Sequence, residues 1–141
     1  MAIIEAVKNF ILQCPHLDEL KKVNVDFLPS DPDTYSIEEE PTEVVLREFI
    51  DGSSERQFVF VFASRMRWNE EIINNIQNSG FFEKFQEWLE ECTELEKFPL
   101  LDKGMSAYKI EAMSNGYLFD VSGNSEYARY QIQCRLLYDK E

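Results

Sequence analysis

The chain has 141 residues, 44% of them hydrophobic, and a formal net charge of −13 at pH 7. This length suits one domain, residues 1–141, and the apolar content is enough for a core, which excludes disorder of the whole chain. The excess of acids argues against specific binding to nucleic acid or to an anionic membrane, because both need clustered Lys or Arg.

The acidity is concentrated in two segments. Residues 31–55 carry nine acidic residues and one arginine, residues 83–102 carry seven acidic residues and two lysines, and the remainder sums to zero. Such segments form a solvated, solubilising surface, or an acidic face that meets a basic partner or imitates a nucleic-acid backbone. Both interpretations stay open here.

The first third of the chain predicts one helix and several extended segments. Residues 2–13 place apolar side chains at helical spacing, with charges and flanks unlike those of a signal peptide or a membrane span. Residues 22–28 alternate as a short strand does, and residues 34–37 and 43–50 are further extended candidates. Residues 51–54, Asp-Gly-Ser-Ser, are typical of a hairpin turn.

Residues 56–63 predict a central strand. Phe58, Phe60 and Phe62 fall on one face, and Val59 and Val61 on the other. A strand that is apolar on both faces is usually covered on both sides.

A helical region follows. Residues 68–71 are expected to open it, and Ile72, Ile73 and Ile76 to form its buried stripe. Ser79-Gly80 interrupts the pattern, which then resumes until Pro99, with glutamates on the outer face. Because glycine weakens a helix, we expect a helical pair, either two helices or one with a kink.

Three extended runs make up the last third: residues 106–113, 117–121 and a long final strand, with turn residues at 114–116 and 122–124. The final run alternates between an apolar face and a polar face formed by Arg129, Gln131, Gln133 and Arg135. The sequence therefore predicts an α+β fold, with an N-terminal helix and a central helical pair packed on a mixed, mostly antiparallel sheet that ends in a β-meander.

The residues that usually carry chemistry do not form a recognisable constellation. His16 is the single histidine, and Cys14, Cys92 and Cys134 are far apart and fall on apolar stripes. Zinc ligands need closer spacing, and nucleophilic catalysis needs a base next to the nucleophile. We therefore expect no catalytic residue, no metal and no cofactor, and three reduced, buried thiols.

Two polar groups are candidates for a protein interface. Arg65, Arg67 and Trp68 follow the most hydrophobic strand, and Arg and Trp are enriched where interfaces carry their binding energy. The polar face of the last strand, Arg129, Gln131, Gln133 and Arg135, is the second group. The alternative is that Trp68 only staples the start of the helix and both arginines face solvent.

From Trp68 onward the chain resembles the tail-terminator and minor-capsid (tail completion) family of long-tailed bacteriophages, in the versions carried by phages and prophages of Gram-positive bacteria. The resemblance lies in residues 85–89 (Phe-Gln-Glu-Trp-Leu), 98–101, 107–112, 115–119 and 128–138. It implies a small α+β subunit that assembles into a ring, typically a hexamer, closes the tail tube and meets other tail or connector proteins. It also implies a protein of the bacterial cytoplasm during assembly and of the virion afterwards, without catalytic residues.

An acidic inhibitor is the alternative. An immunity-like or DNA-mimic protein would use the acids of residues 31–55 and 83–102 as a phosphate-like array against a basic enzyme. An acyltransferase or hydrolase is a third possibility, but the sequence lacks a positioned nucleophile and base.

Overall fold

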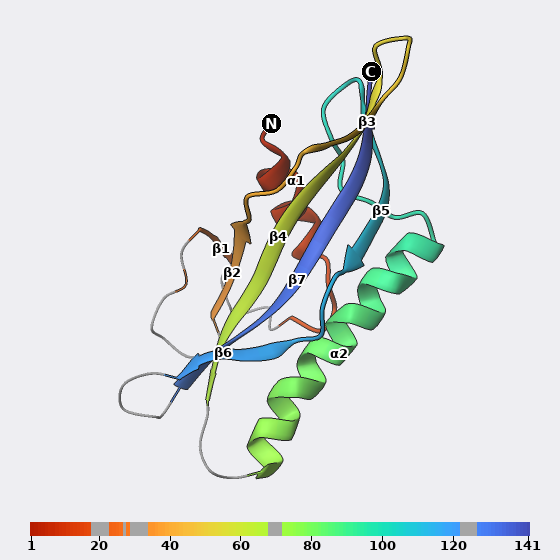
Figure 1. The fold of residues 1–141 in the computed structure, drawn as a ribbon. Coiled ribbons are helices and arrows are strands. Elements are labelled where there is room, and N and C mark those ends of the chain that lie inside the picture. Colours follow the sequence, from red (N-terminus) through yellow and green to blue (C-terminus); the bar gives the residue numbers. More distant parts are fainter. Residues whose placement is uncertain (18–22, 27, 29–33, 68–71, 122–126) are drawn as a thin grey trace.

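The structure is a computed structural model that describes residues 1–17, 23–26, 28, 34–67, 72–121 and 127–141, with residues 72–75 described by their backbone alone. Its helices and strands are labelled in Figure 1. All the strands of this part of the chain belong to one mixed, mostly antiparallel sheet, in which β1 runs parallel to β2, so the predicted α+β class is confirmed. The helices are α1 (Ile3–Ile11) and α2 (Ile72–Glu94), and the strands are β1 (Val23–Val25), β2 (Thr34–Glu39), β3 (Val45–Glu48), β4 (Ser54–Arg67), β5 (Met105–Ala112), β6 (Tyr117–Val121) and β7 (Tyr127–Lys140).

The sheet is built around one long pair of strands. β4 and β7 have 14 residues each and pair along their whole length, from Ser54 opposite Lys140 to Arg67 opposite Tyr127. Each strand thereby provides the backbone partners that the other needs at both ends. Because β2 and β3 pair with the other edge of β4, the predicted central position of this strand is confirmed.

Each outer edge of this pair carries a strand that is interrupted once. β2 and β3 both run antiparallel to β4, with residues 40–44 between them. β5 and β6 both run antiparallel to β7, with residues 113–116 between them. Apart from β1, the sheet therefore consists of two long hairpins that lie side by side through β4 and β7 (Figure 1).

The three C-terminal strands are present, but their pairing departs from the predicted meander. A meander would place β6 between β5 and β7, whereas both pair with the same edge of β7. Asn115 and Gly116 lie in the break between β5 and β6 and make no hairpin turn. The Met113 N–H donates to the Gln133 carbonyl (2.6 Å), and the Gln133 N–H donates to Ser114 Oγ (3.1 Å), so the break stays attached to β7.

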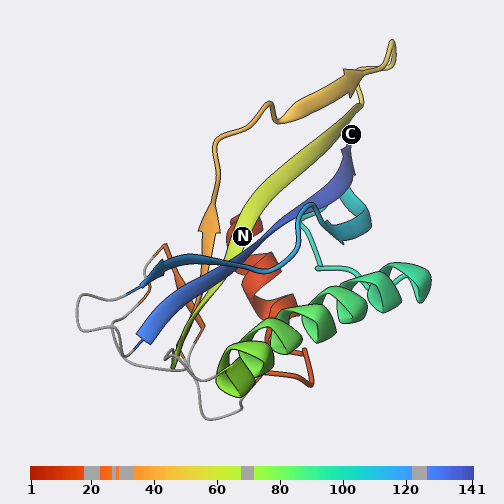
Figure 2. The ribbon, with the colours of Figure 1, turned by 60° about the horizontal axis from the view of Figure 1, so that its bottom comes forward.

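Both helices pack on the same face of the sheet, as Figure 2 shows from a second direction. The ring of Phe62 on β4 meets Phe85 of α2 edge to face, with centroids 4.5 Å apart. The rings of Phe10 on α1 and Trp88 on α2 pack against each other with their centroids 5.1 Å apart, which closes the core between the helices. Alternate residues of β4 and β7 supply the sheet side of this core, as the period-2 pattern predicted.

The helical region forms one continuous helix through Ser79-Gly80, in place of a pair. The predicted stripe is wrong at Ile76, which is 63% exposed, whereas the side chains of Ile72 and Ile73 lie outside the described residues. Packing of the second half holds the helix instead. There, Thr93 Oγ1 donates to the Ile110 carbonyl (2.8 Å) and ties α2 to β5.

Candidate protein interface

The sheet face opposite the helices is covered by polar side chains of the strands themselves, and we call it the open face. Its floor is an apolar row on β4, Val59, Val61 and Ala63, at 6%, 3% and 0% exposed. Within the described residues no helix lies over this row, so the surrounding side chains shield it. The polar members of the open face include Glu38, Gln57, Arg65, Glu111, Arg129, Gln131, Gln133 and Arg135.

Arg129 is the centre of one network on this face. Its Nη2 pairs with Glu38 Oε2 at 2.7 Å, so the ion pair joins β7 to β2 across β4. Its Nε donates to Gln131 Oε1 (2.9 Å), and Gln131 in turn donates to Tyr117 Oη (2.6 Å). The guanidinium also lies 5.2 Å from the centre of the Phe119 ring, in cation–π range.

Arg135 is the centre of a second network. Its Nη2 lies 3.1 Å from Glu111 Oε1, and Lys109 Nζ lies 3.0 Å from Glu111 Oε2. Burial disfavours the charged carboxylate, but the hydrogen bond from Lys109 and the charge of Arg135 outweigh it and lower the pKa of Glu111. Arg135 also contacts Gln57, whose amide donates to Thr42 Oγ1 (3.0 Å). The open face is therefore a set of ion pairs and amide hydrogen bonds within the chain.

The structure places most of the predicted interface residues on this one face. Arg65 and Arg129 lie directly opposite each other on β4 and β7, next to Gln131. Arg67 is exposed at the end of β4, where its carbonyl accepts a hydrogen bond from Asn78 Nδ2 (2.7 Å). Trp68 lies outside the described residues. Arg129, Gln131 and Arg135 already have partners within the chain. A protein that bound through them would have to replace these intramolecular hydrogen bonds and ion pairs with intermolecular ones.

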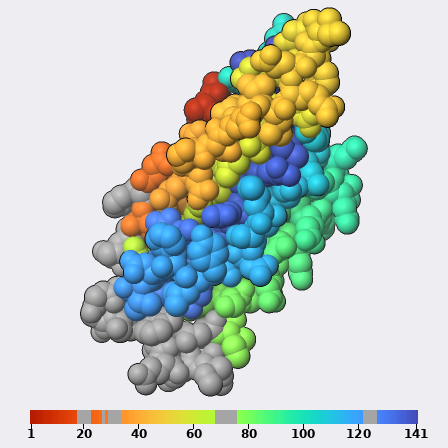
Figure 3. Space-filling model, viewed as in Figure 1, coloured from red at the N-terminus to blue at the C-terminus, as the bar shows by residue number. Residues whose placement is uncertain are grey.

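The end of the first hairpin projects from the body as an apolar arm. We call residues 44–53 the hairpin arm, which forms the yellow lobe at the upper end of the molecule in Figure 3. Gly52 has φ +92°, and Asp51 Oδ1 accepts hydrogen bonds from the Ser53 N–H (2.9 Å) and Oγ (2.6 Å), so the predicted hairpin turn is confirmed. Its exposed large apolar side chains are Val44, Leu46, Phe49 and Ile50. Exposed apolar side chains that gather on one element mark a contact surface.

The hairpin arm is the feature that the sequence predictions missed. The sequence predicts a strand over residues 43–50 and a turn over residues 51–54, and it indicates a role only for the acids of this region. The available signal was the adjacent apolar pair Phe49-Ile50 directly before Asp51-Gly52, because successive side chains of an extended segment point to opposite faces and one of the two cannot reach a core on one side.

The three cysteines are free and buried, as predicted. Burial raises the pKa of the thiols of Cys14, Cys92 and Cys134, most strongly for Cys134. A thiol with a raised pKa is a poor nucleophile at neutral pH, because the thiolate is the reactive form. His16 is exposed and lines a hollow with Tyr35 and other side chains from β4 and α2.

The outer face of α2 is acidic, as predicted. Its glutamates Glu83, Glu87, Glu90, Glu91 and Glu94 are all exposed. Neither helix of the described residues combines the length and the apolar character that crossing a membrane requires. Among the same residues, no group of three or more His, Cys, Asp or Glu side chains is placed to hold a metal ion.

A scan against protein-family models found no match to this sequence, and a search of curated proteins found no relative. The interface described above therefore rests on the chain's own geometry.

Proposed function

We propose that this protein is a structural subunit of a bacteriophage particle, a tail-terminator or head–tail joining protein that assembles into a ring. The hairpin arm is the observation that carries the proposal. A subunit with a closed core, an internally bonded open face and a projecting apolar arm is suited to docking against other subunits.

Two further features support the proposal. The resemblance over residues 85–138 is to a family of ring-forming tail proteins, and the two-hairpin sheet with helices on one face agrees with the small α+β subunit that it implies. The exposed glutamates of α2 would suit a wall past which DNA moves without sticking, because like charges repel.

Induction of the prophage that carries the gene tests this proposal. In the intact strain, peptides of this protein are expected in purified particles, and antibody labelling is expected at the joint between head and tail. In a strain that lacks the gene, unjoined heads and tails are expected, and the gene supplied in trans should restore joined particles.

The acidic-inhibitor alternative predicts a different outcome. The protein would then be missing from particles, and deletion would leave joined heads and tails intact. A tight complex of the purified chain with a cationic nuclease, weakened by salt, would favour the inhibitor, because such an interface relies on the acids of residues 31–55 and 83–102.

A further inference from the structure

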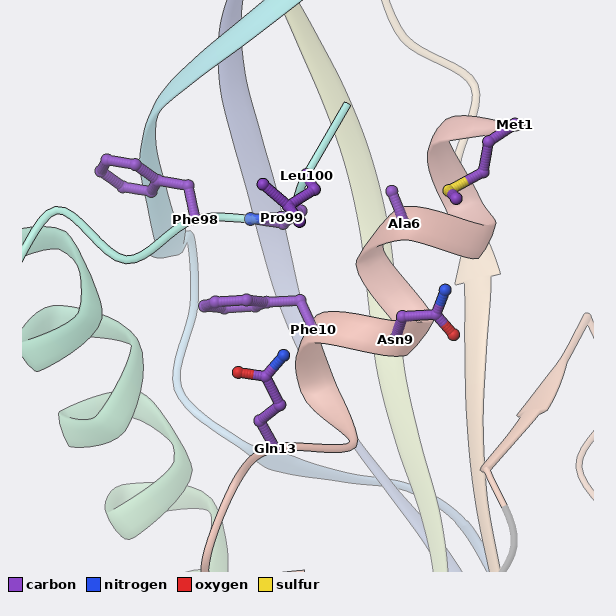
Figure 4. Close-up of a pocket in the computed structure, with 8 residues that line it drawn as sticks. All are labelled: Met1, Ala6, Asn9, Phe10, Gln13, Phe98, Pro99 and Leu100. Atoms are coloured by element: carbon purple, nitrogen blue, oxygen red, sulfur yellow. The ribbon is translucent and has the colours of Figure 1, made fainter. Parts of the chain in front are cut away.

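The chain carries a hollow whose size and polarity suit the end of the hairpin arm. The hollow lies between α1 and residues 98–100 and has a volume of about 150 Å³. Figure 4 shows Ala6, Asn9 and Phe10 of α1 on one side and Phe98 and Leu100 on the other. Apolar cavities of about this volume accept a group as large as benzene. One large apolar side chain therefore fits.

The hollow differs in charge from the rest of this acidic chain. The side chains that line it are apolar or, at Asn9 and Gln13, uncharged amides, and the α-ammonium of the lining residue Met1 is paired with Asp102 at 2.9 Å, although the chain has a net charge of −13. A second acidic chain is repelled from most of this surface, and a hollow lined by uncharged side chains is a place where it can approach. The two amides are suited to bond the backbone of an incoming turn.

The arm provides the matching shape. Ile50 is fully exposed at the end of the arm, and Phe49 beside it is also exposed. The exposed carboxylates of Glu48 and Asp51 flank this apolar pair. A hydrogen bond from the Ser53 hydroxyl, and another from the Ser53 backbone N–H, lower the pKa of Asp51, so its charge persists at mildly acidic pH.

The charges beside the hollow are complementary to those of the arm. Lys97 and Lys103 are both exposed and lie on either side of residues 98–100 in the chain, and with the α-ammonium of Met1 they outnumber the exposed acids of this stretch, Glu96 and Asp102. When the apolar end of an arm enters the hollow, Glu48 and Asp51 come near ammonium groups, because each pair of charges flanks its apolar partner. Such an arrangement favours one docking orientation.

We propose that the end of the hairpin arm, Phe49-Ile50, docks into the α1 hollow of a second copy of this chain. Each copy then has one arm and one hollow, which are different surfaces, so the contact is heterologous and propagates around a closed ring. This inference deepens the proposed function, because a ring-forming subunit needs two complementary patches. The self-contact itself is measured independently of any phage particle.

Sedimentation velocity of the full chain over a range of concentrations tests the contact. The unmodified chain is expected to associate as concentration rises. Ile50→Asp removes the apolar end, and Asn9→Trp fills the hollow from an exposed position, so each is expected to weaken association about 100-fold. Leu118→Asp, at an exposed apolar residue of β6, is the matched control and should associate normally.

A mixture of the two variants gives the sharpest result. Ile50→Asp keeps its hollow and Asn9→Trp keeps its arm, so together they have one working contact and are expected to form a heterodimer. Circular dichroism melts confirm that each variant folds, and Leu100→Asp at the exposed rim replaces Asn9→Trp if the latter does not. Raising the salt concentration should weaken association, because the flanking charges are exposed.

Three results would overturn the inference: an unmodified chain that stays monomeric at every concentration, variants that associate like the control, or a mixture that stays monomeric. Such a failure is separable from failure of the proposed function. If particles still carry the protein at the head–tail joint, the subunit function stands and the arm binds another surface. If the self-contact holds and particles lack the protein, the phage function is wrong.

Discussion

The two hairpins of the sheet have the same plan but differ in how much helix covers them. α2 has 23 residues, about 35 Å at the usual rise per residue, whereas α1 has 9 residues, about 13 Å. β4 is 14 residues long, about 46 Å, so α1 is far too short to cover the first hairpin. The end of that hairpin therefore becomes an exposed arm, and we conclude that helix length decides which strand ends join the core.

Hydrogen bonds hold the breaks in both outer strands, and packing also holds the second one. The break at residues 40–44 is held by hydrogen bonds, since the Gln57 amide donates to Thr42 Oγ1 and to the Glu43 carbonyl (2.8 Å). The break at residues 113–116 is hydrogen-bonded to Gln133 and is also held by packing, since Gly116 lies directly against Phe82 of α2. Substitutions at these two places separate packing from hydrogen bonding in the same sheet.

Gly116→Ala is expected to have the largest effect. A Cβ at this position would overlap the side chain of Phe82, which is buried in the core, so strand or helix must move. We expect a loss of about 3 kcal/mol in the free energy of unfolding, measured by urea titration.

Gly80→Ala is the matched control for this substitution. A Cβ at Gly80 meets no atom within 4 Å, and the residue lies inside α2, so alanine should stabilise the protein by about 0.5–1 kcal/mol. If Gly116→Ala and Gly80→Ala changed the free energy of unfolding equally, Gly116 would not lie close against α2.

Gln57→Ala is expected to have the next largest effect. It removes the two side-chain hydrogen bonds from Gln57 that help to hold the first break, for a cost of about 1–2 kcal/mol in the free energy of unfolding. Gln133→Ala is the control, because the Gln133 side chain is partly buried on the same face but has no hydrogen-bond partner among the described residues. Equal losses in urea titrations of the two variants would show that the first break is not held through Gln57.

The ion pair between Arg129 and Glu38 links the two hairpins across β4. Both side chains are partly buried, at 18% and 28% exposed, so solvent screens the pair less than a surface pair. A double-mutant cycle with Arg129→Gln and Glu38→Gln is expected to give a coupling of about 0.5–1.5 kcal/mol. Additive losses would mean that the pair does not join β7 to β2 energetically.

Tyr108 links the hairpins in the other direction, because its hydroxyl on β5 bonds Glu55 on β4 across β7. Burial and the Glu55 carboxylate raise the pKa of Tyr108 from 10.0 to about 12. The folded chain thus keeps this proton more tightly than the unfolded chain does. The stability involved is fully present below pH 10 and is lost as pH rises toward 12.

The loss of stability at alkaline pH should be the smallest of the four predicted effects. Tyr108 is 37% exposed, so after allowance for solvent screening we expect a loss of about 0.5–1 kcal/mol. Tyr138, whose pKa burial also raises, contributes in the same range, so the test is the difference between the unmodified chain and Tyr108→Phe in urea titrations at pH 9 and pH 11.5. A parallel pH dependence in the two proteins would contradict the assignment to Tyr108.

Local pattern predicted much of this fold because it reports which side of a strand is buried. The alternation of residues 128–138 correctly separated the core face of β7 from the face that carries Arg129, Gln131, Gln133 and Arg135. The two apolar faces of β4 predicted its central place, and Asp51-Gly52 predicted its turn. These features depend on residues close in sequence, so one sequence is sufficient to find them.

Pairing and exposure were decided only in the folded chain. β7 is long enough to take both β5 and β6 on one edge, so Asn115-Gly116 serves a close approach to Phe82 instead of a hairpin turn. Likewise, Phe49 and Ile50 stay exposed because α1 ends before it reaches them, and the apolar pattern alone reads the same whether a helix covers it or not. The sequence by itself determined which residues are apolar enough to favour burial and which segments form strands. The tertiary structure decided which strands pair and which apolar residues are covered. Pairing and covering depend on the lengths and edges of elements that are far apart in the chain.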